Sequence, residues 1–508
     1  MDTIIEVRDL EKHFGSVVAN KNISFKLKQN KVYALLGENG AGKSTLMNML
    51  SGIYKPDKGE IFLKGEKIIF SSPKDAIKNG IGMIHQHFKL VENKSALDNI
   101  ILGQYNGFFV NRKKIREKVM GVCEEFGLSI DLDKNIEDMS ISEKQTTEII
   151  KVLYRGSKIL ILDEPTAVLT PQEITNLFRI MNNMREKGCT LIIITHKLHE
   201  ILEISDEVII MRKGQFIEDV ITSETNEKEL TDLMVGESVD LKIERVVVPD
   251  GREILHVKDL VVEDRDRIKK LNGVSFHLRE GEVLGVAGLA GSGQKELCET
   301  LNGVIKATSG DIIYEGDSLK NKTPREIIEK GVSMSFIPED RLGMGLIAPM
   351  SMTDNLILKN YYKQTGIYLD RKDAVIQGER LIRDLQIKTP GIHHPVKQLS
   401  GGNIQKILLG RELDTHPHLL ITAYATRGLD VQSSHLIYDE INKQKQNNVG
   451  VIYVGEDLDV LLELSDRIMV LCDGEITGIV DATATDREEL GFLMGGKKLE
   501  EIEGAKHG

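Results

Sequence analysis

A glycine-rich segment with a lysine and a serine carries the strongest chemical signal in this sequence. Residues 37–45 read Gly-Glu-Asn-Gly-Ala-Gly-Lys-Ser-Thr and fit the pattern G-x-x-x-x-G-K-[ST], placed between an apolar run and a helical pattern. Glycines let backbone N–H groups turn toward phosphate oxygens, and the N-terminus of a helix favours their negative charge. We expect Lys43 to neutralise the β- and γ-phosphates of a nucleotide and the Ser44 hydroxyl to bind Mg²⁺. The residues predicted to bind the nucleotide here are Gly37, Glu38, Asn39, Gly40, Ala41, Gly42, Lys43, Ser44 and Thr45.

A pair of carboxylates follows a second apolar run. Residues 159–162 read Ile-Leu-Ile-Leu and lead into Asp163 and Glu164. We expect Asp163 to hold Mg²⁺ through water and Glu164 to orient or deprotonate an attacking water molecule, a role worth about 10²–10⁴-fold in rate. Paired carboxylates at a strand end are often ordinary loop residues, but with a phosphate-binding loop in the same chain they indicate hydrolysis of a nucleoside triphosphate.

The same organisation occurs twice along the chain. Residues 4–10 match residues 254–260, and the phosphate-binding loop returns as residues 288–295. The glycines persist in the second copy, but Gln294 and Lys295 stand where the first copy has its lysine and its serine. One step along a helix turns a side chain by about 100°, so Lys295 is not expected to replace the missing lysine. A chain of 508 residues is also too long for one hydrophobic core.

The repeat predicts two domains, residues 1–240 and 252–498. Residues 241–251 carry turn residues and are assigned to a short linker, and residues 499–508 to a polar tail. Within each half, apolar runs alternate with helical patterns, which is typical of an α/β fold with a largely parallel sheet. Residues 88–155 lack such runs and are predicted to form a helical insertion.

Several elements can be placed in the first half. Buried strands are predicted at Val32–Leu36, 158–162 and Thr190–Ile194. The segment Thr170-Pro171-Gln172-Glu173 has the form of a capping box with proline at the first helical position. A helix is therefore expected to begin there and to end near Lys187.

Composition places the chain among ordinary globular proteins and narrows its class. Hydrophobic residues make up 41% and charged residues 28%, and the longest apolar runs are far below the roughly 18–20 residues needed to span a bilayer. No secretory signal is visible at the N-terminus, and the four scattered cysteines form no CxxC pair, which fits a reducing cytoplasm. A net charge of −12 disfavours non-specific binding to nucleic acid.

Three short motifs give the sequence its family resemblance. Residues 163–166 read Asp-Glu-Pro-Thr, residues 85–87 read His-Gln-His upstream of them, and Thr195-His196 follows downstream. Together they resemble the ATPase subunits of ABC transporters. The resemblance implies two tandem P-loop NTPase domains of the ABC type, each an α/β RecA-like core with a helical subdomain, with ATP and Mg²⁺ as cofactors.

The resemblance also assigns roles to single residues. Gln86 would bind Mg²⁺ and link the γ-phosphate and the metal to a membrane subunit, His196 would contact the γ-phosphate, and Phe14 would stack on adenine. Residues 85–87 could instead be metal ligands, although no third ligand is apparent in the sequence. The residues given catalytic roles are Lys43, Gln86, Glu164 and His196, and those given to Mg²⁺ are Ser44, Gln86 and Asp163.

In this family each ATP lies between the phosphate-binding loop of one domain and an LSGGQ-type segment of the other. Residues 399–403 of the second half read Leu-Ser-Gly-Gly-Asn, close to that segment, and the loop that holds Asp430 would reach across to the opposite site. The resemblance therefore implies a composite site with a complete set of groups. Its members are Lys43, Gln86, Asp163, Glu164 and His196 together with Ser400, Gly401, Gly402 and Asp430.

The other composite site collects the altered residues. Its members are Gly288, Gly293, Gln294, Lys295, Glu339, Ala423, Tyr424 and Glu456 together with Ser140 and Ser142 of the first half. Glu456 stands at the position of His196, and a glutamate facing the γ-phosphate would repel it. We therefore expect one site to hydrolyse ATP, and the other to bind it without turnover or to stay empty.

Further motifs suggest the branch of the family. Residues 338–341 and 426–430 look like the second halves of simple-sugar importer ATPases, whereas residues 85–88, 153–156 and 167–173 lean toward nucleoside importers. The resemblance implies one copy of the chain at the cytoplasmic face of the membrane, with two permease subunits and an external substrate-binding lipoprotein. One alternative is a simple-sugar importer.

A second alternative is a soluble tandem ABC protein that acts on ribosomes or nucleic acid, although such proteins usually keep two intact sites and a long charged linker. A regulatory binding module without turnover is disfavoured by the complete first site.

Overall fold

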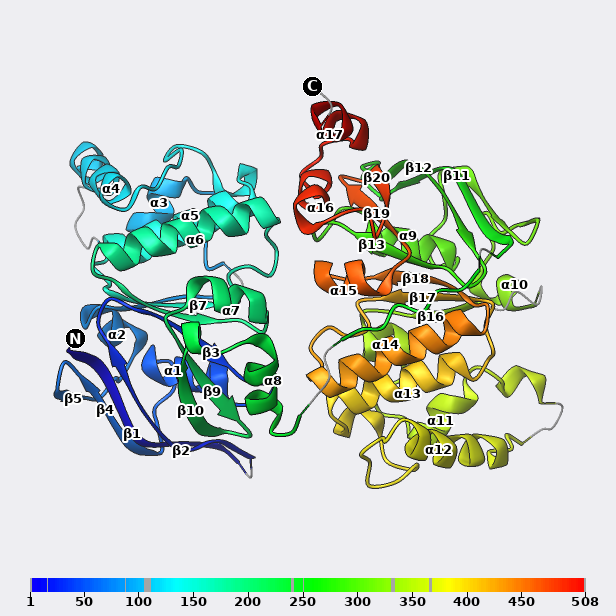
Figure 1. Ribbon diagram of the computed structural model, residues 1–508, viewed down its shortest axis with the longest axis horizontal. Coiled ribbons are helices and arrows are strands. Elements are labelled where there is room, and N and C mark those ends of the chain that lie inside the picture. The colour runs from blue at the N-terminus through cyan, green and yellow to red at the C-terminus, as the bar shows by residue number, and fades with distance from the viewer. Residues whose placement is uncertain are drawn as a thin grey trace. The chain divides into compact units, whose positions relative to one another are not determined.

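The chain forms two compact units, Met1–Asp240 and Leu241–Gly508 (Figure 1). The computed structural model describes residues 2–15, 17–86, 88–104, 111–238, 242–249, 251–329, 334–364 and 368–506. Each unit contains a six-stranded sheet and a four-stranded sheet, so the sequence repeat corresponds to a repeated fold. The structure therefore agrees with the predicted α/β class.

The first unit is built on a mainly parallel sheet. Its strands, in spatial order, are β10 (Gln215–Ile221), β9 (Glu207–Arg212), β3 (Val32–Leu36), β8 (Thr190–Ile194), β7 (Ile159–Asp163) and β6 (Ile81–Ile84). Only β10 runs antiparallel to its neighbour in this sheet. The central strands are buried along their whole length, which explains their continuous apolar sequences.

A second, antiparallel sheet completes the core of the first unit. Its strands, in order, are β2 (Val17–Lys28), β1 (Thr3–Phe14), β4 (Lys58–Leu63) and β5 (Glu66–Ile68). One hydrophobic cluster joins side chains of both sheets with the helix α1 (Lys43–Leu50). The remaining longer helices are α2 (Pro73–Lys78), α3 (Ala96–Ile101), α4 (Arg112–Phe126), α5 (Ile141–Tyr154), α6 (Pro171–Glu186), α7 (Leu198–Ile204) and α8 (Glu227–Val235).

Several predicted elements of the first unit are confirmed. The strands at Val32–Leu36 and Thr190–Ile194 have the expected bounds, and β7 lies one residue beyond its predicted range. Thr170 and Glu173 form the predicted capping box at the start of α6. The described part of residues 88–155 is helical: α3 and α4 both pack on α5.

The second unit repeats this plan. Its mainly parallel sheet has the order β16 (Met334–Ile337), β17 (Leu419–Ala423), β18 (Gly450–Val454), β13 (Val283–Ala287), β19 (Arg467–Cys472) and β20 (Glu475–Asp481). Its antiparallel sheet has the order β12 (Lys269–Arg279), β11 (Glu253–Glu263), β14 (Ser309–Tyr314) and β15 (Asp317–Ser318). The longer helices are α9 (Gln294–Leu301), α10 (Pro324–Glu329), α11 (Met352–Ile357), α12 (Lys372–Asp384), α13 (Gly401–Leu413), α14 (Val431–Gln446), α15 (Leu458–Leu464), α16 (Arg487–Met494) and α17 (Leu499–Lys506).

Two segments differ from the prediction because they pack on the second unit. In the segment assigned to a linker, residues 242–249 are described: Ile243 is buried in a core cluster of this unit, and Arg245 donates hydrogen bonds to backbone carbonyls at the end of α15. The segment assigned to a polar tail forms α17, whose Ile502 is buried in the same cluster. The apolar side chains of both segments are thereby removed from water, so neither is a free connection or tail.

Candidate nucleotide site

The carboxyl edge of the parallel sheet in the first unit brings the predicted functional segments together. The strands β3, β6, β7 and β8 are parallel, so their carboxyl ends meet at one edge. The phosphate-binding loop follows β3, Gln86 follows β6, Asp163 and Glu164 lie at the end of β7, and His196 follows β8. In open α/β sheets this edge is where ligands bind.

The phosphate-binding loop requires glycine at two close backbone contacts. Gly42 caps α1 in the left-handed region with φ 92°, and a Cβ there would lie 2.4 Å from the carbonyl oxygen of Ala19. A Cβ on Gly37 would lie 2.4 Å from the carbonyl oxygen of Met211. A side chain at either position would displace backbone, so the glycines fix the path of the loop.

Lys43 lies inside this loop. Its ammonium group donates hydrogen bonds to the backbone carbonyls of Gly37 and Glu38. Burial lowers the pKa of Lys43, whereas the charges of Glu164, Asp163 and Glu38 oppose that shift. A bound phosphate would place negative charge next to the Lys43 ammonium, which otherwise has only the charges of nearby carboxylates around it.

Glu164 is the centre of a hydrogen-bonded group of three side chains. The amide of Gln86 donates to Glu164 Oε2 at 2.8 Å, and Nδ1 of His196 lies 3.3 Å from Glu164 Oε1. The backbone of Glu164 is in the left-handed region with φ 45°, a conformation that costs about 1–3 kcal/mol in a non-glycine residue. The fold therefore holds this carboxylate in one specific place.

The two carboxyl groups have opposite pKa shifts. The hydrogen bond to His196 lowers the pKa of Glu164, against the effect of burial. Burial, followed by the charge of Glu164, raises the pKa of Asp163. A bound cation would favour the charged form of Asp163, and its carboxylate, the Gln86 amide and the Ser44 hydroxyl are oxygen donors of the type that Mg²⁺ prefers.

Phe14, the predicted adenine platform, lies at the end of β1 and is 44% exposed. Its ring meets that of Tyr54 edge to face, with centroids 5.3 Å apart, and Lys12 Nζ lies 5.7 Å from its centroid. Tyr54 is a supporting residue that the sequence motifs do not reveal. An exposed ring fixed from the side in this way can accept a stacked base.

The equivalent position in the second unit is Asp264, a residue that the sequence motifs do not single out. The β1–β2 and β11–β12 hairpins share their register, and Asp264 follows β11 where Phe14 ends β1. Asp264 Oδ1 accepts hydrogen bonds from the backbone of Asp266 and Ile268, both at 2.9 Å. This carboxylate closes a turn and offers no ring to a base. The offset of 250 residues that relates 4–10 to 254–260 also relates Phe14 to Asp264, and this is the signal in the sequence that identifies the position.

In the second phosphate-binding loop, Gln294 makes the contact that Lys43 makes in the first. Its amide donates to the backbone carbonyl of Leu289 at 3.1 Å, and the side chain is almost completely buried. Lys295 is largely exposed, and its ammonium lies 3.9 Å from Glu299 one helical turn away. The loop of the second unit is thus closed by a neutral amide.

An ion-paired group occupies the carboxyl edge of the second unit. Arg427 forms an ion pair with Glu339, and its Nε lies 3.3 Å from Glu456 Oε1. The two glutamates stand where the first unit has Gln86 and His196, as the matching strand registers show. From sequence alone Glu456 was predicted to act as a repulsive charge, and its pairing with Arg427 was not predicted.

Ala423 and Tyr424 replace the two carboxylates of the first unit. Ala423 pairs with Val454 on the neighbouring strand, as Asp163 pairs with Ile194. Tyr424 keeps the left-handed backbone of Glu164, with φ 52°, and burial raises the pKa of its hydroxyl. A partly buried, neutral phenol cannot act as the base that Glu164 provides.

The predicted LSGGQ-type segment of the second unit begins α13. Ser400 is its N-cap, and the amide of Asn403 donates to Ser400 Oγ at 2.7 Å. Asp430 caps α14 and accepts hydrogen bonds from the backbone and hydroxyl of Ser433, at 2.8 and 3.0 Å. Gly402 lies beside Ser433, since a Cβ on it would be 3.0 Å from Ser433 Oγ. Gly401 and Gly402 begin the helix without side chains of their own, and a Cβ on Gly401 would lie 3.4 Å from Arg341 Nη1.

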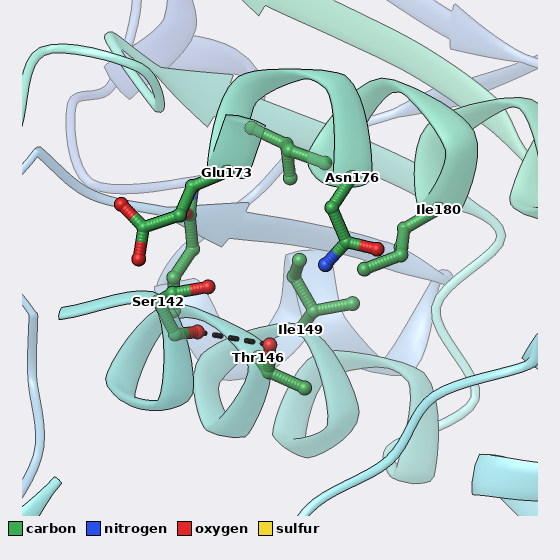
Figure 2. Close-up of a pocket in the computed structure, with 8 residues that line it drawn as sticks. Ser142, Thr146, Ile149, Glu173, Asn176 and Ile180 are labelled. Carbon is green, nitrogen blue, oxygen red and sulfur yellow. Dashed lines mark hydrogen bonds between the residues drawn. The ribbon is translucent and has the colours of Figure 1, made fainter. Parts of the chain in front are cut away.

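The matching segment of the first unit uses its serine internally. Ser140 forms a capping box with Glu143, which also accepts a hydrogen bond from Lys134. Ser142 lines a water-sized pocket between α5 and α6 together with Thr146, Glu173, Asn176 and other residues (Figure 2). The Thr146 hydroxyl donates to the backbone carbonyl of Ser142 at 2.9 Å. Side chains at this helix start thus serve local packing and capping.

The structure brings the catalytic residues predicted for the first unit to one edge. Ser400, Gly401, Gly402 and Asp430 belong to the second unit, so their part in the same site stays a prediction. Of the His-Gln-His motif, His87 lies outside the described residues. His85 is partly buried, which lowers the pKa of its imidazole. Among the described residues, no group of three or more His, Cys, Asp or Glu side chains could hold a metal ion.

Comparison with known proteins defines the class. The family model described as ABC transporter matches residues 20–167 and 271–425, one match in each unit. The chain belongs to this family, and it is an ATPase with two tandem ABC domains. Within the described residues, no helix combines the length and the apolar character needed to cross a bilayer.

Relatives match the chain along nearly its whole length. It is 40% identical over 505 residues to the nucleoside import ATP-binding protein NupA of Lactococcus lactis subsp. cremoris (strain MG1363), covering 98% of this chain and 99% of the relative. It is 41% identical over 507 residues to the guanosine import ATP-binding protein NupO of Bacillus subtilis (strain 168), covering 99% of each. It is 37% identical over 495 residues to the galactose/methyl galactoside import ATP-binding protein MglA of Clostridium perfringens (strain ATCC 13124), covering 96% and 95%.

Proposed function

We propose that this chain is the ATP-hydrolysing, energy-coupling subunit of a nucleoside importer. The observation that carries the proposal is the full-length similarity to two relatives that are named for nucleoside and guanosine import. The galactose-type relative is less similar, and it supports the alternative of a simple-sugar importer.

Hydrolysis is assigned to the first unit. Lys43 and the loop glycines hold the phosphates, Phe14 stacks on the base, and Glu164 orients the attacking water and accepts its proton. Gln86 and His196 fix the Glu164 carboxylate through hydrogen bonds on both of its oxygens. When bound, Mg²⁺ would be held by Ser44, Asp163 and Gln86 and would neutralise charge on the phosphates.

The second unit contributes in a different way. Ser400, Gly401, Gly402 and Asp430 are proposed to complete the ATP site of the first unit. In the other site, Gln294, Ala423 and Tyr424 replace the lysine and the two carboxylates, and the carboxylates of Glu339 and Glu456 are paired with Arg427. We therefore propose one hydrolytic site per chain.

The partners follow from the importer function. The chain is proposed to bind, as one copy, two permease subunits at the cytoplasmic face of the membrane, and an external substrate-binding lipoprotein would deliver the nucleoside. Gln86 and Glu339 lie at equivalent strand ends of the two units, and these are the places where the permease subunits are expected to dock.

Uptake by intact cells tests the proposal. Cells that carry the native chain or Glu164→Gln are supplied with labelled guanosine, uridine, ribose or galactose. We expect the native chain alone to support nucleoside uptake. Selective loss of sugar uptake would favour the sugar importer, and unchanged uptake of all four compounds would contradict an importer role and favour the soluble alternative.

A further inference from the structure

A buried carboxylate that belongs to none of the predicted motifs lies directly behind the first-unit site. Glu200 is in the first turn of α7 and is completely buried. Its Oε2 accepts hydrogen bonds from the hydroxyl of Thr166 at 2.6 Å and from the hydroxyl of Thr195 at 3.2 Å. One oxygen atom thus joins two segments that are distant in the sequence.

Both segments carry the groups assigned to hydrolysis. Thr166 lies two residues after Glu164, and Thr195 immediately precedes His196. The contact between Glu164 and His196, at 3.3 Å, therefore spans the same two segments that Glu200 ties together from behind. Movement of either segment would change the position of the Glu164 carboxylate.

Lys197 supplies the charge that this buried carboxylate needs. Its ammonium lies 3.1 Å from Glu200 Oε1 and also approaches the backbone carbonyl of Thr166 at 3.5 Å. The backbone N–H of Lys197 donates to the Thr195 hydroxyl. Burying a charge is costly unless it is paired or hydrogen-bonded, and here Oε2 accepts two hydrogen bonds while Oε1 is held by the ion pair with Lys197.

The second unit has neither this arrangement nor the catalytic residues of the first. Val460 stands at the position of Glu200, and Gly455 at that of Thr195. Thr426, which matches Thr166, instead lies 3.5 Å from the hydroxyl groups of Tyr438 and Tyr453. The carboxylate bridge thus occurs in the unit that keeps Glu164 and His196.

We propose that Glu200 is a positioning residue for ATP hydrolysis: it fixes the Glu164 segment against the His196 segment. The inference rests on the proposed function of the first-unit site. The hydrogen bonds and the ion pair of Glu200 go to Thr166, Thr195 and Lys197, and none of these residues belongs to the phosphate-binding loop or the base platform. Loss of Glu200 should therefore affect the chemical step and leave ATP binding in place.

Steady-state ATPase kinetics of the full-length chain test this role. We expect Glu200→Gln to lower kcat by between about tenfold and about 10²-fold, with KM for ATP unchanged within about twofold. A rise in KM with kcat unchanged, or no change in either, would overturn the inference.

The two threonines give a second test that does not disturb the buried charge. Thr166→Val and Thr195→Val nearly keep side-chain shape, and each opens the bridge on one side. We expect each to lower kcat, and the double variant to lose no more than the more severe single variant, because a bridge opened once no longer joins the segments. Additive losses would contradict the bridge.

A matched control separates positioning from general destabilisation. Glu412 is also completely buried, and it pairs with Arg411 and Lys359 in the second unit, both at 2.8 Å. Glu412→Gln should lower the Tm and leave kcat unchanged; an equal fall in kcat would overturn the inference. Glu164→Gln is measured in parallel: if it keeps ATPase activity, the proposed site itself fails, whereas if it alone loses activity, only the role of Glu200 fails.

Discussion

At the carboxyl edges of their parallel sheets, the two units share a backbone conformation but carry different side chains. Glu164 and Tyr424 both adopt left-handed backbone, and their N–H groups donate to matching carbonyls, Ile194 at 2.8 Å and Val454 at 2.9 Å. In the first unit, amide and imidazole groups surround a carboxylate; in the second, a guanidinium joins two carboxylates. The same left-handed backbone thus occurs in both units, with a carboxylate at this position in the first and a phenol in the second.

The same contrast extends behind the edge. The first unit buries the Glu200 carboxylate among hydroxyls and an ammonium, whereas the second fills the equivalent region with tyrosine rings around Thr426. The two units therefore differ in the side chains behind the edge as well as in the catalytic side chains at the edge.

The largest expected effect comes from the phosphate-binding loops. Lys43→Ala removes the buried cation from the first loop, and we expect the ATPase rate to fall by at least about 10²-fold. Gln294→Ala removes a neutral amide and should change the rate by less than about twofold. ATPase assays on the two purified variants give the comparison, and equal losses would show that both loops serve hydrolysis.

A smaller effect is expected at the base platform. Phe14→Ala should weaken ATP binding by about tenfold, because stacking of a base on an aromatic ring is worth about 1–3 kcal/mol. Asp264→Ala should leave the affinity unchanged. Titration with a fluorescent ATP analogue measures both, and a comparable loss in Asp264→Ala would mean that the second unit holds a base as well.

The pH dependence of stability should differ after loss of His196. The pKa of Glu164 in the folded chain lies below the ordinary glutamate value of 4.5, so its contribution to stability is present above about pH 4.5 and is lost as pH falls through the folded-state pKa. His196→Ala removes the main cause of the shift. We expect the Tm of the native chain to fall more steeply between about pH 5 and pH 3 than that of the variant; parallel curves would contradict this coupling.

The smallest effect is expected at the ion-paired group of the second unit. The side chains of Arg427, Glu339 and Glu456 are 51%, 42% and 48% exposed, so solvent screens their attraction. Arg427→Ala should lower the free energy of unfolding by no more than about 1 kcal/mol. Denaturant unfolding measures the loss, and a loss several times larger would show that this group is essential to the fold.

Local patterns predicted much of the fold, and they supplied the residues of the first-unit site, whose role in binding ATP stays a prediction. The capping box at Thr170, the buried strands and the glycine-rich loop depend on neighbours in sequence, and the structure confirms these elements. The segments at Ile243 and Ile502 were misassigned because their apolar side chains find partners only in the folded second unit.

Interactions between distant residues were the part that sequence could not supply. Arg427 and Glu339 are 88 residues apart, and Glu200 and Thr166 are 34 apart. No spacing rule links such pairs, because their approach is set by the order of strands in the sheet.

The central claim, that the chain hydrolyses ATP only at the edge of the first unit, is tested most directly by paired substitutions at one backbone position. ATPase rates of the full-length chain are measured for Glu164→Gln and for Tyr424→Phe. We expect Glu164→Gln to lower the ATPase rate by about 10²-fold or more and Tyr424→Phe to leave the rate unchanged. Retained activity in Glu164→Gln, or an equal loss in Tyr424→Phe, would contradict it.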